Sequence, residues 1–477
     1  MARARLSFLS GEEADLIHAE SMKLLGGMGI MVRSESVLKV LGDAGAEVDG
    51  RTMIAKLSES MIEEALRMAP KRIRLCGRDP KHDLEIPVED VPYVSTTGLS
   101  THMIDLETGE KRTAGLADLA DFARLGDALE GLDFFWTTVI PSDVPELAHA
   151  VHGLWTSMKN TTKHVEQVEV RNAEDARVQI ALASLVAGGD EELRKRPIIS
   201  AVCSPISPLT FGKSTIEGQA ELARAGVPIV SMTMPLSGLT APVTVAGTIT
   251  VVNAENLANL AITQFVAEGA PFIYSSDAVP ANMTTGDVSF EAVEVPLLMT
   301  GTAQMAKRYG LPCMVGDWGL CGGPTPGLLA SLSEISSTTL DTFSGTDMCS
   351  GIGSVENSMV SSLEQMVIDA YIWYNWKGFL RKVPVTEETI AADVIRKVGH
   401  GNSFISNAHT ARNFREALYT RDPKATSWEA TMSSKMVPEA RAIAKELLRT
   451  HRVEPLPDDV IRKGDEVVKA YERSLVS

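Results

Sequence analysis

Residues Leu311–Gly323, with the sequence LPCMVGDWGLCGG, contain the pattern from which the fold is argued. Residues 312–316 are apolar or small at every position, which is typical of a parallel strand that helices cover. The polarity then changes at Asp317 and Trp318, and a glycine-rich turn follows. A carboxylate and a large aromatic ring at the end of a buried strand need either a ligand or an internal partner. The stretch therefore predicts a strand that ends at a functional loop or at a structural turn.

Similar strand segments recur from residue 91 onward, and segments with helical spacing of apolar residues separate them. The strand segments are Pro92–Thr97, Asp133–Ile140, His164–Val170, Pro197–Ser204, Pro228–Thr233, Pro271–Ser276, Pro312–Asp317 and Asp347–Gly353. The helical segments are Leu116–Leu129, Val144–Met158, Ala173–Ala187, Thr215–Arg224, a stretch within Val243–Glu268, Phe290–Tyr309, Gly327–Thr342 and the residues from Val355 onward. This alternation predicts an α/β protein with a (β/α)8 TIM-type barrel. An open doubly wound sheet is the alternative, although no GxGxxG motif opens the first helix.

Helical segments flank the predicted barrel on both sides. Residues 11–47 contain two of them, and a serine cap at Ser58 opens a third helix that ends before Pro70. The later helices are expected at Thr386–Arg396, from His409, at Pro438–His451 and at Asp458–Leu475. We therefore predict an N-terminal helical cap (residues 1–90), the barrel (91–380) and a C-terminal helical extension (381–477).

The composition narrows the classes of partner and compartment. The chain has 45 basic and 62 acidic residues, and the net charge of −17 argues against nucleic acid or an anionic membrane as a partner. Neither a membrane span nor a signal peptide is apparent. Five separated cysteines without a CxxC pair favour a reducing compartment and give little support for a zinc site. We expect a cytoplasmic protein without a metal site.

In barrels of this kind the active site lies at the carboxyl ends of the strands. The predicted strand ends are rich in hydroxyl groups and poor in strong acids and bases: Thr96, Thr97, Thr137, Thr138, Glu166, Gln167, Cys203, Ser204, Thr233, Tyr274, Ser275, Ser276, Asp317, Trp318, Ser350, Gly351 and Gly353. His164 begins a strand and therefore belongs to the opposite end. A reaction with little proton transfer fits this set better than Ser–His–Asp or metal-dependent hydrolysis.

Two aromatic residues and two carboxylates at these ends suggest a cation site. Trp318 and Tyr274 would supply aromatic faces, and Asp317 or Glu166 a nearby negative charge. Such a set suits a quaternary ammonium, which each aromatic face stabilises by roughly 0.5–2 kcal/mol. A structural role also stays open, in which Trp318 fills the barrel mouth and Asp317 caps the next helix.

Two glycine turns are candidate sites for an anion. One contains Gly319, Gly322 and Gly323, and the other contains Gly351 and Gly353. Each is expected to lead into a helix whose N-terminus would bind a phosphate or a substrate carboxylate. Tight turns that merely close the last strands explain these glycines equally well.

Several segments along the chain share their pattern with a known family. They are Leu106–Arg112, Leu116–Arg124, Asn160–Lys163, Asn253–Ala258, Ser362–Asp369 and His409–Glu416. Over nearly its whole length the chain resembles the trimethylamine methyltransferase family. The resemblance implies a (β/α)8 barrel that moves a methyl group from a methylated amine to the cobalt of a separate corrinoid (cobalamin) protein.

The resemblance has a departure that bears on the substrate. The trimethylamine enzymes themselves carry pyrrolysine near the barrel mouth, whereas residues 316–323 are all ordinary here. The chain therefore resembles the non-pyrrolysine branch, for which glycine betaine and related quaternary amines are the known kind of substrate. Around Gly399–Ser403 the family pattern also differs, so no catalytic role is carried over to His400.

The expected function is that of a quaternary amine:corrinoid methyltransferase of one-carbon metabolism, with glycine betaine as the preferred donor. A quaternary ammonium leaves as a neutral tertiary amine, so no general acid is needed. Asp317 is the candidate catalytic residue, and the candidate substrate contacts are Trp318, Tyr274, Glu166, Gly319, Gly322, Gly351 and Gly353. We expect a homo-oligomer without a tightly bound cofactor, because the corrinoid belongs to the partner protein. Proline betaine, carnitine or another methylated amine are alternative substrates, and a non-catalytic methylated-amine binding protein is an alternative function.

Overall fold

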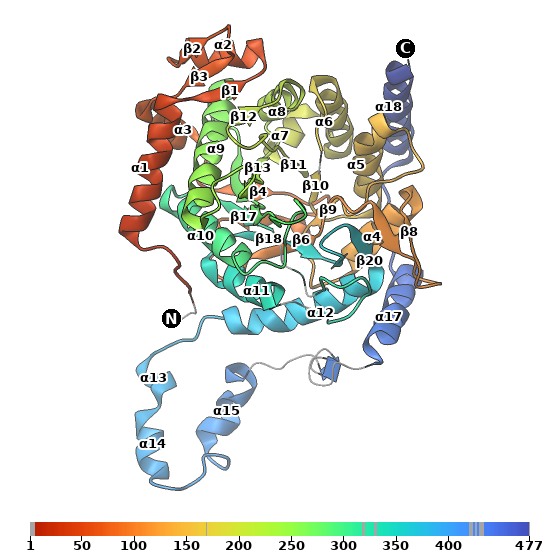
Figure 1. Ribbon diagram of the computed structural model, residues 1–477. Coiled ribbons are helices and arrows are strands. Elements are labelled where there is room, and N and C mark those ends of the chain that lie inside the picture. Colours follow the sequence, from red (N-terminus) through yellow and green to blue (C-terminus); the bar gives the residue numbers. More distant parts are fainter. Residues whose placement is uncertain are drawn as a thin grey trace.

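The computed structural model describes residues 5–167, 169–316, 319, 321–328, 332–418, 423–424, 427–428 and 434–476 (Figure 1). Its centre is an eight-stranded sheet. The strands are β6 (Tyr93–Thr96), β9 (Phe135–Trp136), β10 (Val165–Gln167), β11 (Ile199–Val202), β13 (Ile229–Thr233), β15 (Phe272–Ser276), β17 (Cys313–Val315) and β18 (Met348–Ile352). Neighbours pair in parallel, and a bridge between Ser95 and Phe134 joins β6 to β9. The sheet thus closes into the predicted barrel, and each of the eight predicted strand segments contains one of these strands.

The helices that follow these strands form the outer layer of the barrel. They are α4 (Leu116–Ala128), α5 (His149–Asn160), α6 (Ala173–Ala187), α8 (Lys213–Ala225), α9 (Val245–Val266), α10 (Val295–Arg308), α11 (Leu332–Ser344) and α12 (Leu363–Leu380). Shorter helices are η1 (Pro80–His82), η2 (Glu146–Ala148) and α7 (Asp190–Lys195). None of the helices in the described part of the chain combines the length and apolarity needed to cross a bilayer.

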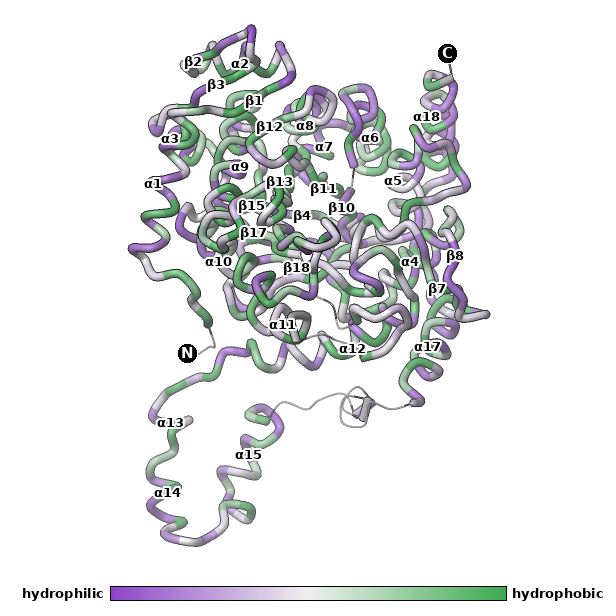
Figure 2. The backbone as a smooth tube through the Cα atoms, in the orientation of Figure 1, coloured by the Kyte–Doolittle hydropathy of each residue, from purple (hydrophilic) through white to green (hydrophobic). Residues whose placement is uncertain are grey.

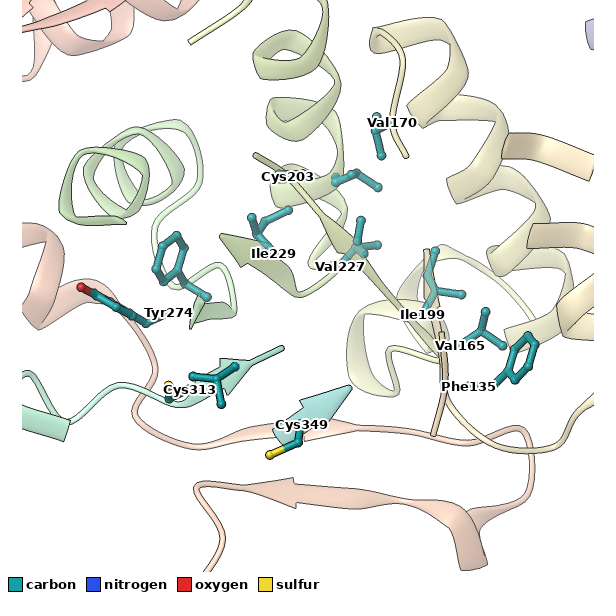
Figure 3. Packing of buried hydrophobic residues seen from close by; sticks show 14 of the residues in the cluster. Phe135, Val165, Val170, Ile199, Cys203, Val227, Ile229, Tyr274, Cys313 and Cys349 are labelled. Atoms are coloured by element: carbon teal, nitrogen blue, oxygen red, sulfur yellow. The ribbon is translucent and has the colours of Figure 1, made fainter. Parts of the chain in front are cut away.

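Apolar side chains fill both faces of the barrel strands. Phe135, Val165, Ile229 and Cys313 point outward into the layer between strands and helices (Figure 3). Their neighbours along the strands, such as Val230, point inward and form a separate cluster. Because successive residues of a strand face opposite sides, a strand covered on both sides must be apolar throughout. This explains why the strand segments could be recognised as continuous apolar runs.

Helix α9 explains a run of asparagines within the most apolar stretch of the sequence. The amide of Asn256 donates to the Ser275 carbonyl oxygen (2.9 Å), and that of Asn259 donates to Ser231 Oγ (2.9 Å). Helices α1 (Gly11–Gly27) and α3 (Glu59–Met68) pack on its outer side. Because α9 is covered on both sides, its polar groups need partners within the protein, and these bonds attach it to β13 and β15.

The N-terminal region is less helical than predicted. Besides α1, α2 (Glu35–Asp43) and α3, it contains the strands β1 (Ile30–Val32), β2 (Glu47–Asp49) and β3 (Ile54–Lys56). They form a sheet with β12 (Thr210–Phe211), which belongs to the barrel region. Strands of three residues are too short to produce a recognisable alternation, so the sequence pattern missed them.

A hairpin from the N-terminal region closes the amino end of the barrel. It consists of β4 (Ile73–Leu75) and β5 (Leu84–Ile86). Their inward side chains pack in one cluster with Phe134, Met314 and Met348 of the barrel interior. The described residues of this hairpin therefore fill the interior at the amino end of the strands.

The helix predicted from Val355 onward begins later than expected. After β18 the chain forms the strands β19 (Ser354–Val355) and β20 (Val360–Ser362), which join the strands β7 (His102–Ile104) and β8 (Lys111–Thr113). Helix α12 starts only after Ser362, whose hydroxyl accepts the Gln365 N–H. A further small sheet joins β14 (Leu236–Ser237) to β16 (Val279–Pro280).

The C-terminal extension has two parts (Figure 1). Helix α17 (Met436–Thr450) packs on α12 and α4, and α18 (Asp458–Val476) packs on α6 and α5. Residues 383–418, which we call the arm, contain α13 (Glu387–Ile390), α14 (Ala392–Val398) and α15 (Ala408–Ala417) and project away from the barrel. Hydrophobic and hydrophilic residues alternate along the arm (Figure 2).

Candidate functional site

Glu166 lies in the barrel interior. Its strand neighbour Val165 packs in the outer layer, and the Gln167 amide donates to the Ala150 carbonyl oxygen of α5 (2.9 Å). Strand alternation therefore points the intervening Glu166 inward. Its carboxyl is fully buried, Oε2 lies 3.5 Å from Ser200 Oγ, and Oε1 has no hydrogen-bond partner in the described structure. Burial raises the pKa of Glu166 to about 8.

His164 contacts Ser200, the neighbour of Glu166. His164 Nδ1 lies 3.1 Å from the Cys76 carbonyl oxygen, and Nε2 lies 3.0 Å from Ser200 Oγ. Burial lowers the pKa of His164 to about 4, so the ring is neutral near pH 7. A carbonyl only accepts, so Nδ1 carries the proton and Nε2 accepts the Ser200 hydroxyl proton. Ser200 Oγ also lies 3.5 Å from Glu166 Oε2, at the limit of a hydrogen bond. As expected, His164 itself lies nearer the amino end of the strands than Glu166 does.

Trp136 is an interior aromatic residue that the sequence analysis did not select. It lies opposite Glu166 in the register between β9 and β10. Its indole packs against Gly98 so closely that a Cβ there would lie 2.7 Å from the ring. The Nε1–H is buried without a partner among the described residues. An inward-facing tryptophan next to a carboxyl could have been found from the strand alternation in Asp133–Ile140.

Asp277 is a second carboxyl that the sequence analysis missed. It follows β15 directly, one residue after the predicted strand end at Ser276. The carboxylate lies against Gly316, where a Cβ would come within 2.3 Å of Oδ1. Burial raises the pKa of Asp277 to about 6, and its carboxylate has no hydrogen-bond or ion-pair partner in the described part of the chain. A glycine at 316 therefore leaves room for this side chain at the end of β17.

The barrel thus contains two buried atoms without partners among the described residues, Trp136 Nε1 and Glu166 Oε1, and the carboxylate of Asp277 beside Gly316. Ser275, which shares the inward orientation of Ile273 on β15, adds a buried hydroxyl without a partner among the described residues. Buried polar atoms without partners are rare in proteins and indicate a ligand or water at the site. Since burial is what raises the pKa of both carboxyl groups, a cation between them would favour their ionised forms.

Tyr274 lies outside this interior. It points from β15 toward α9 (Figure 3), and its hydroxyl donates to Asn253 Oδ1 (3.0 Å). The side chain is fully buried among the outer-layer residues. The prediction that its ring faces a ligand in the mouth is wrong. Tyr274 lies two residues after Phe272 on β15, so both side chains point outward from the barrel. Trp136 supplies an inward aromatic face instead.

The predicted glycine turns have different surroundings. Asp317 and Trp318 lie outside the described residues. Gly319 adjoins Gly351, since a Cβ on Gly319 would lie 3.5 Å from the Gly351 carbonyl oxygen. The Gly353 N–H donates to Asp369 Oδ2 (2.9 Å), so this donor is already used.

The prediction that a helix directly follows Gly353 is also wrong, because the β19–β20 hairpin intervenes. For the other turn, Gly322 is half-buried, and residues 329–331, which precede α11, lie outside the described part of the chain.

Loops at the carboxyl ends of the strands form a polar pocket and an apolar rim. The pocket is lined by Glu169, Val170, Arg171, Val202, Ser204 and Thr215. Because Val202 belongs to the interior cluster, this pocket adjoins the barrel mouth. Exposed apolar side chains, which we call the rim, lie in the loops after the barrel strands: Leu99, Leu147, Ile206, Met234, Leu239, Val243, Met283, Val288, Val293 and Met359.

No cluster in the described part of the chain brings together three or more His, Cys, Asp or Glu side chains in an arrangement that could hold a metal ion. The ionisable groups of the mouth form pairs instead. His149 Nε2 lies 2.6 Å from Glu169 Oε2, and this contact raises the pKa of His149 and lowers that of Glu169.

Comparison with known proteins adds independent findings. A family model described as trimethylamine methyltransferase matches residues 2–474. A trimethylamine methyltransferase from Desulfitobacterium hafniense is 30% identical over 471 residues, which cover 98% of this chain and 94% of that protein. A glycine betaine methyltransferase from the same species is 26% identical over 418 residues, covering 87% and 86%. The crystal structure of the Methanosarcina barkeri monomethylamine methyltransferase aligns with a TM-score of 0.49 and 14% identity over 93% of each chain.

Proposed function

The chain belongs to the trimethylamine methyltransferase family, and from this we propose that it transfers a methyl group from a quaternary amine, with glycine betaine preferred, to a corrinoid carried by a separate protein. The observation that carries the proposal is the set of Trp136, Glu166 and Asp277. Trp136 Nε1 and Glu166 Oε1 are buried without partners among the described residues, and burial raises the pKa of Asp277. The similarity to a glycine betaine methyltransferase and the absence of pyrrolysine from residues 316–323 support the choice of substrate.

The ammonium group would be held by charge and by an aromatic face. A quaternary nitrogen donates no hydrogen bond, so Glu166 and Asp277 would act on it through Coulomb attraction. The indole of Trp136 would add a cation–π contact of about 1–2 kcal/mol in a desolvated site.

The carboxylate of glycine betaine would be bound nearer the mouth. Arg171 lines the polar pocket there and supplies a positive charge. The backbone N–H groups of Gly319, Gly322 and Gly351 remain candidates for the same role. Gly353 is less suited, because its N–H is already bound to Asp369.

The corrinoid would supply a cobalt(I) nucleophile that accepts the methyl group. The apolar rim suits the docking of such a partner, because it surrounds the mouth with exposed aliphatic and methionine side chains. The residues of the barrel would exclude water, orient one methyl group outward and release a neutral tertiary amine without a general acid. Asp317, as the candidate catalytic residue, and Trp318 come shortly after β17 in the sequence and remain part of the proposal.

Methyl transfer tests the proposal directly. The purified protein is mixed with reduced cob(I)alamin and with glycine betaine, proline betaine, carnitine or trimethylamine, and methylcobalamin formation is followed by absorbance. We expect the highest rate with glycine betaine and none with trimethylamine. A higher rate with proline betaine or carnitine would make that compound, rather than glycine betaine, the preferred substrate. Tight binding without transfer from any donor would indicate a binding protein.

Calorimetry separates binding from turnover. Glu166→Gln is expected to weaken glycine betaine binding about tenfold or more, since a buried charge is lost. Glu255→Gln is the matched control, because burial raises the pKa of Glu255 to about 7 but its carboxyl binds Ser207 and Leu209 outside the barrel. Equal losses of glycine betaine affinity in both variants would contradict the assignment of Glu166 to the ligand site.

A further inference from the structure

The arm exposes an unusual amount of apolar surface. None of its residues is buried, and its exposed large hydrophobic side chains are Val383, Val385, Ile390, Ile395, Phe404, Ile405, Phe414 and Leu418. Ile405 alone is 83% exposed. No described helix or strand packs extensively on α13, α14 or α15. The arm therefore lacks a hydrophobic core of its own.

Helices as short as these are not stable by themselves in water. The three helices of the arm have 4, 7 and 10 residues. Isolated helices shorter than about 12–15 residues form only marginally, and most helical stability comes from packing of an apolar face. A surface of another molecule must therefore cover the arm if its helices are to persist.

The root of the arm lies at the amino end of the barrel strands. Lys382, the residue before the arm, forms ion pairs with Asp90 (2.8 Å) and Glu89 (3.1 Å). Both acids precede β6, so they mark the end of the barrel opposite the mouth. A partner docked on the rim at the mouth would consequently leave the arm uncovered.

The charge of the arm favours association with a second copy of the chain. Residues 383–418 contain four basic residues (Arg396, Lys397, Arg412, Arg415) and four acidic residues (Glu387, Glu388, Asp393, Glu416), which balance. The whole chain carries −17, so two copies repel each other through most of their surfaces. A neutral, apolar segment is the part of this chain that could contact another copy without that repulsion.

A groove with both apolar and polar lining lies near the same end of the barrel. It is lined by Ala128, Leu129, Glu130, Gly131, Ala370, Tyr371, Tyr374 and Leu447. Residues 128–131 lead from α4 into β9, which places this side of the groove at the amino end of the strands. The groove and the root of the arm thus share one end of the molecule, so both can take part in one reciprocal interface about a two-fold axis.

We propose that the arm of one copy packs into the groove between α4, α12 and α17 of a second copy, and that the exchange is reciprocal. The eight exposed side chains, at about 100 Å² each, amount to roughly 800 Å² per arm, which matches the share of each partner in a standard interface. The assembly leaves both barrel mouths open, so it is compatible with the binding of a second protein at each rim.

Analytical ultracentrifugation tests the role of the arm. The wild-type chain is expected to sediment as a dimer or larger assembly at micromolar concentration. Ile395→Asp/Ile405→Asp should shift the mass to that of a monomer and weaken association at least 100-fold. Val243→Asp/Met283→Asp is the matched control, because these rim side chains are each 68% exposed at the opposite end, and it should keep the wild-type mass. A monomeric wild type, or an arm variant of unchanged mass, would overturn the proposal.

Cross-linking tests which copy provides the groove. All five native cysteines are buried, so Ile405→Cys in the arm and Glu130→Cys in the groove introduce accessible thiols. Mixing the two single variants with a flexible bismaleimide should join one chain of each kind. If the double variant cross-links only within a chain, the arm folds back on its own body and the exchange is refuted.

Discussion

At the residue scale, the barrel interior places a carboxyl group where its charge is disfavoured. Glu166 is fully buried, its Oε1 has no partner among the described residues, and burial raises its pKa to about 8. The free protein therefore holds Glu166 protonated near neutral pH, whereas a bound ammonium would favour the carboxylate. Substrate binding and deprotonation of Glu166 are coupled as a result.

The raised pKa of Glu166 predicts how the stability of the protein depends on pH. Below the unfolded pKa of about 4.5, Glu166 is protonated in both the native and the unfolded state, and it does not change the free energy of unfolding. Between that value and about 8 only the native state keeps the proton, so stability falls as the pH rises and then levels off. Glu166→Gln lacks this loss, so its melting temperature relative to wild type should increase between about pH 5 and about pH 8.

Thermal unfolding of the two proteins across this range checks the prediction. Only the difference between them is interpreted, because other groups titrate equally in both. A difference that stays constant with pH would mean that Glu166 is already ionised in the free protein.

Asp277 should control the pH dependence of ligand affinity. Its folded pKa of about 6 means that a cation binds more weakly below this pH, when the carboxyl is protonated. Asp277→Asn should weaken binding of glycine betaine about tenfold at neutral pH and remove much of the pH dependence between about pH 5 and 7. Calorimetric titration at several pH values measures both effects, and an unchanged affinity would remove Asp277 from the site.

At the element scale, a lysine has a structural role that sequence patterns alone do not reveal. The ammonium of Lys163 is buried and donates to the carbonyl oxygens of Gly126 (2.7 Å), Leu129 (2.8 Å) and Leu132 (2.6 Å). These carbonyls lie in the last turn of α4 and in the loop to β9. Lys163 therefore fixes how α4 joins the barrel, and the segment Asn160–Lys163 is explained by packing rather than by chemistry.

The same loop contains Gly131, which lies so close to the backbone of α12 that a larger residue would not fit. A Cβ on Gly131 would lie 2.2 Å from the Ala370 carbonyl oxygen, an atom of the helix backbone that cannot move aside alone. Gly131→Ala should destabilise the protein by about 1–3 kcal/mol through overpacking. Gly27→Ala is the control, because nothing lies within 4 Å of a Cβ there. Chemical denaturation measures both, and equal stabilities would show that α12 can shift.

At the scale of the whole molecule, the two ends of the barrel differ in the surfaces that they present. The mouth combines an interior of unpartnered polar atoms with the apolar rim, while the amino end carries the β4–β5 hairpin, the groove and the arm. Substrate, partner and second copy would therefore bind without overlap. Because of this separation, substitutions in the rim can be tested without changing the interior or the arm.

Charges on the rim should affect the partner but not the substrate. Val243→Asp/Met283→Asp is expected to raise the KM for the corrinoid protein about tenfold or more, because it interrupts an apolar docking surface. The affinity for glycine betaine should stay within about twofold of wild type, since neither side chain lies in the interior cluster. Steady-state rates at varied corrinoid protein, with calorimetry for the substrate, check both. An unchanged KM would place docking elsewhere.

The sequence alone determined the barrel, because a strand covered on both faces must be apolar at every position and therefore stands out from the helices around it. It also placed Glu166 at a strand end. It missed the strands β1, β2 and β3 of the N-terminal region, which are too short for a pattern, although a short strand at residues 73–76 is predicted and matches β4. It also assigned Tyr274 to the wrong face, because the sequence does not show which side of the strand packs against α9.

Only the tertiary structure brought Trp136, Glu166 and Asp277 to one end of the barrel from three strands far apart in the sequence. It also decided which of their polar atoms lack partners, because that depends on what every neighbouring strand and helix leaves unfilled. The sequence of residues 311–316 predicts the strand. The space beside Gly316 that the Asp277 carboxylate occupies forms only when β15 and β17 pair.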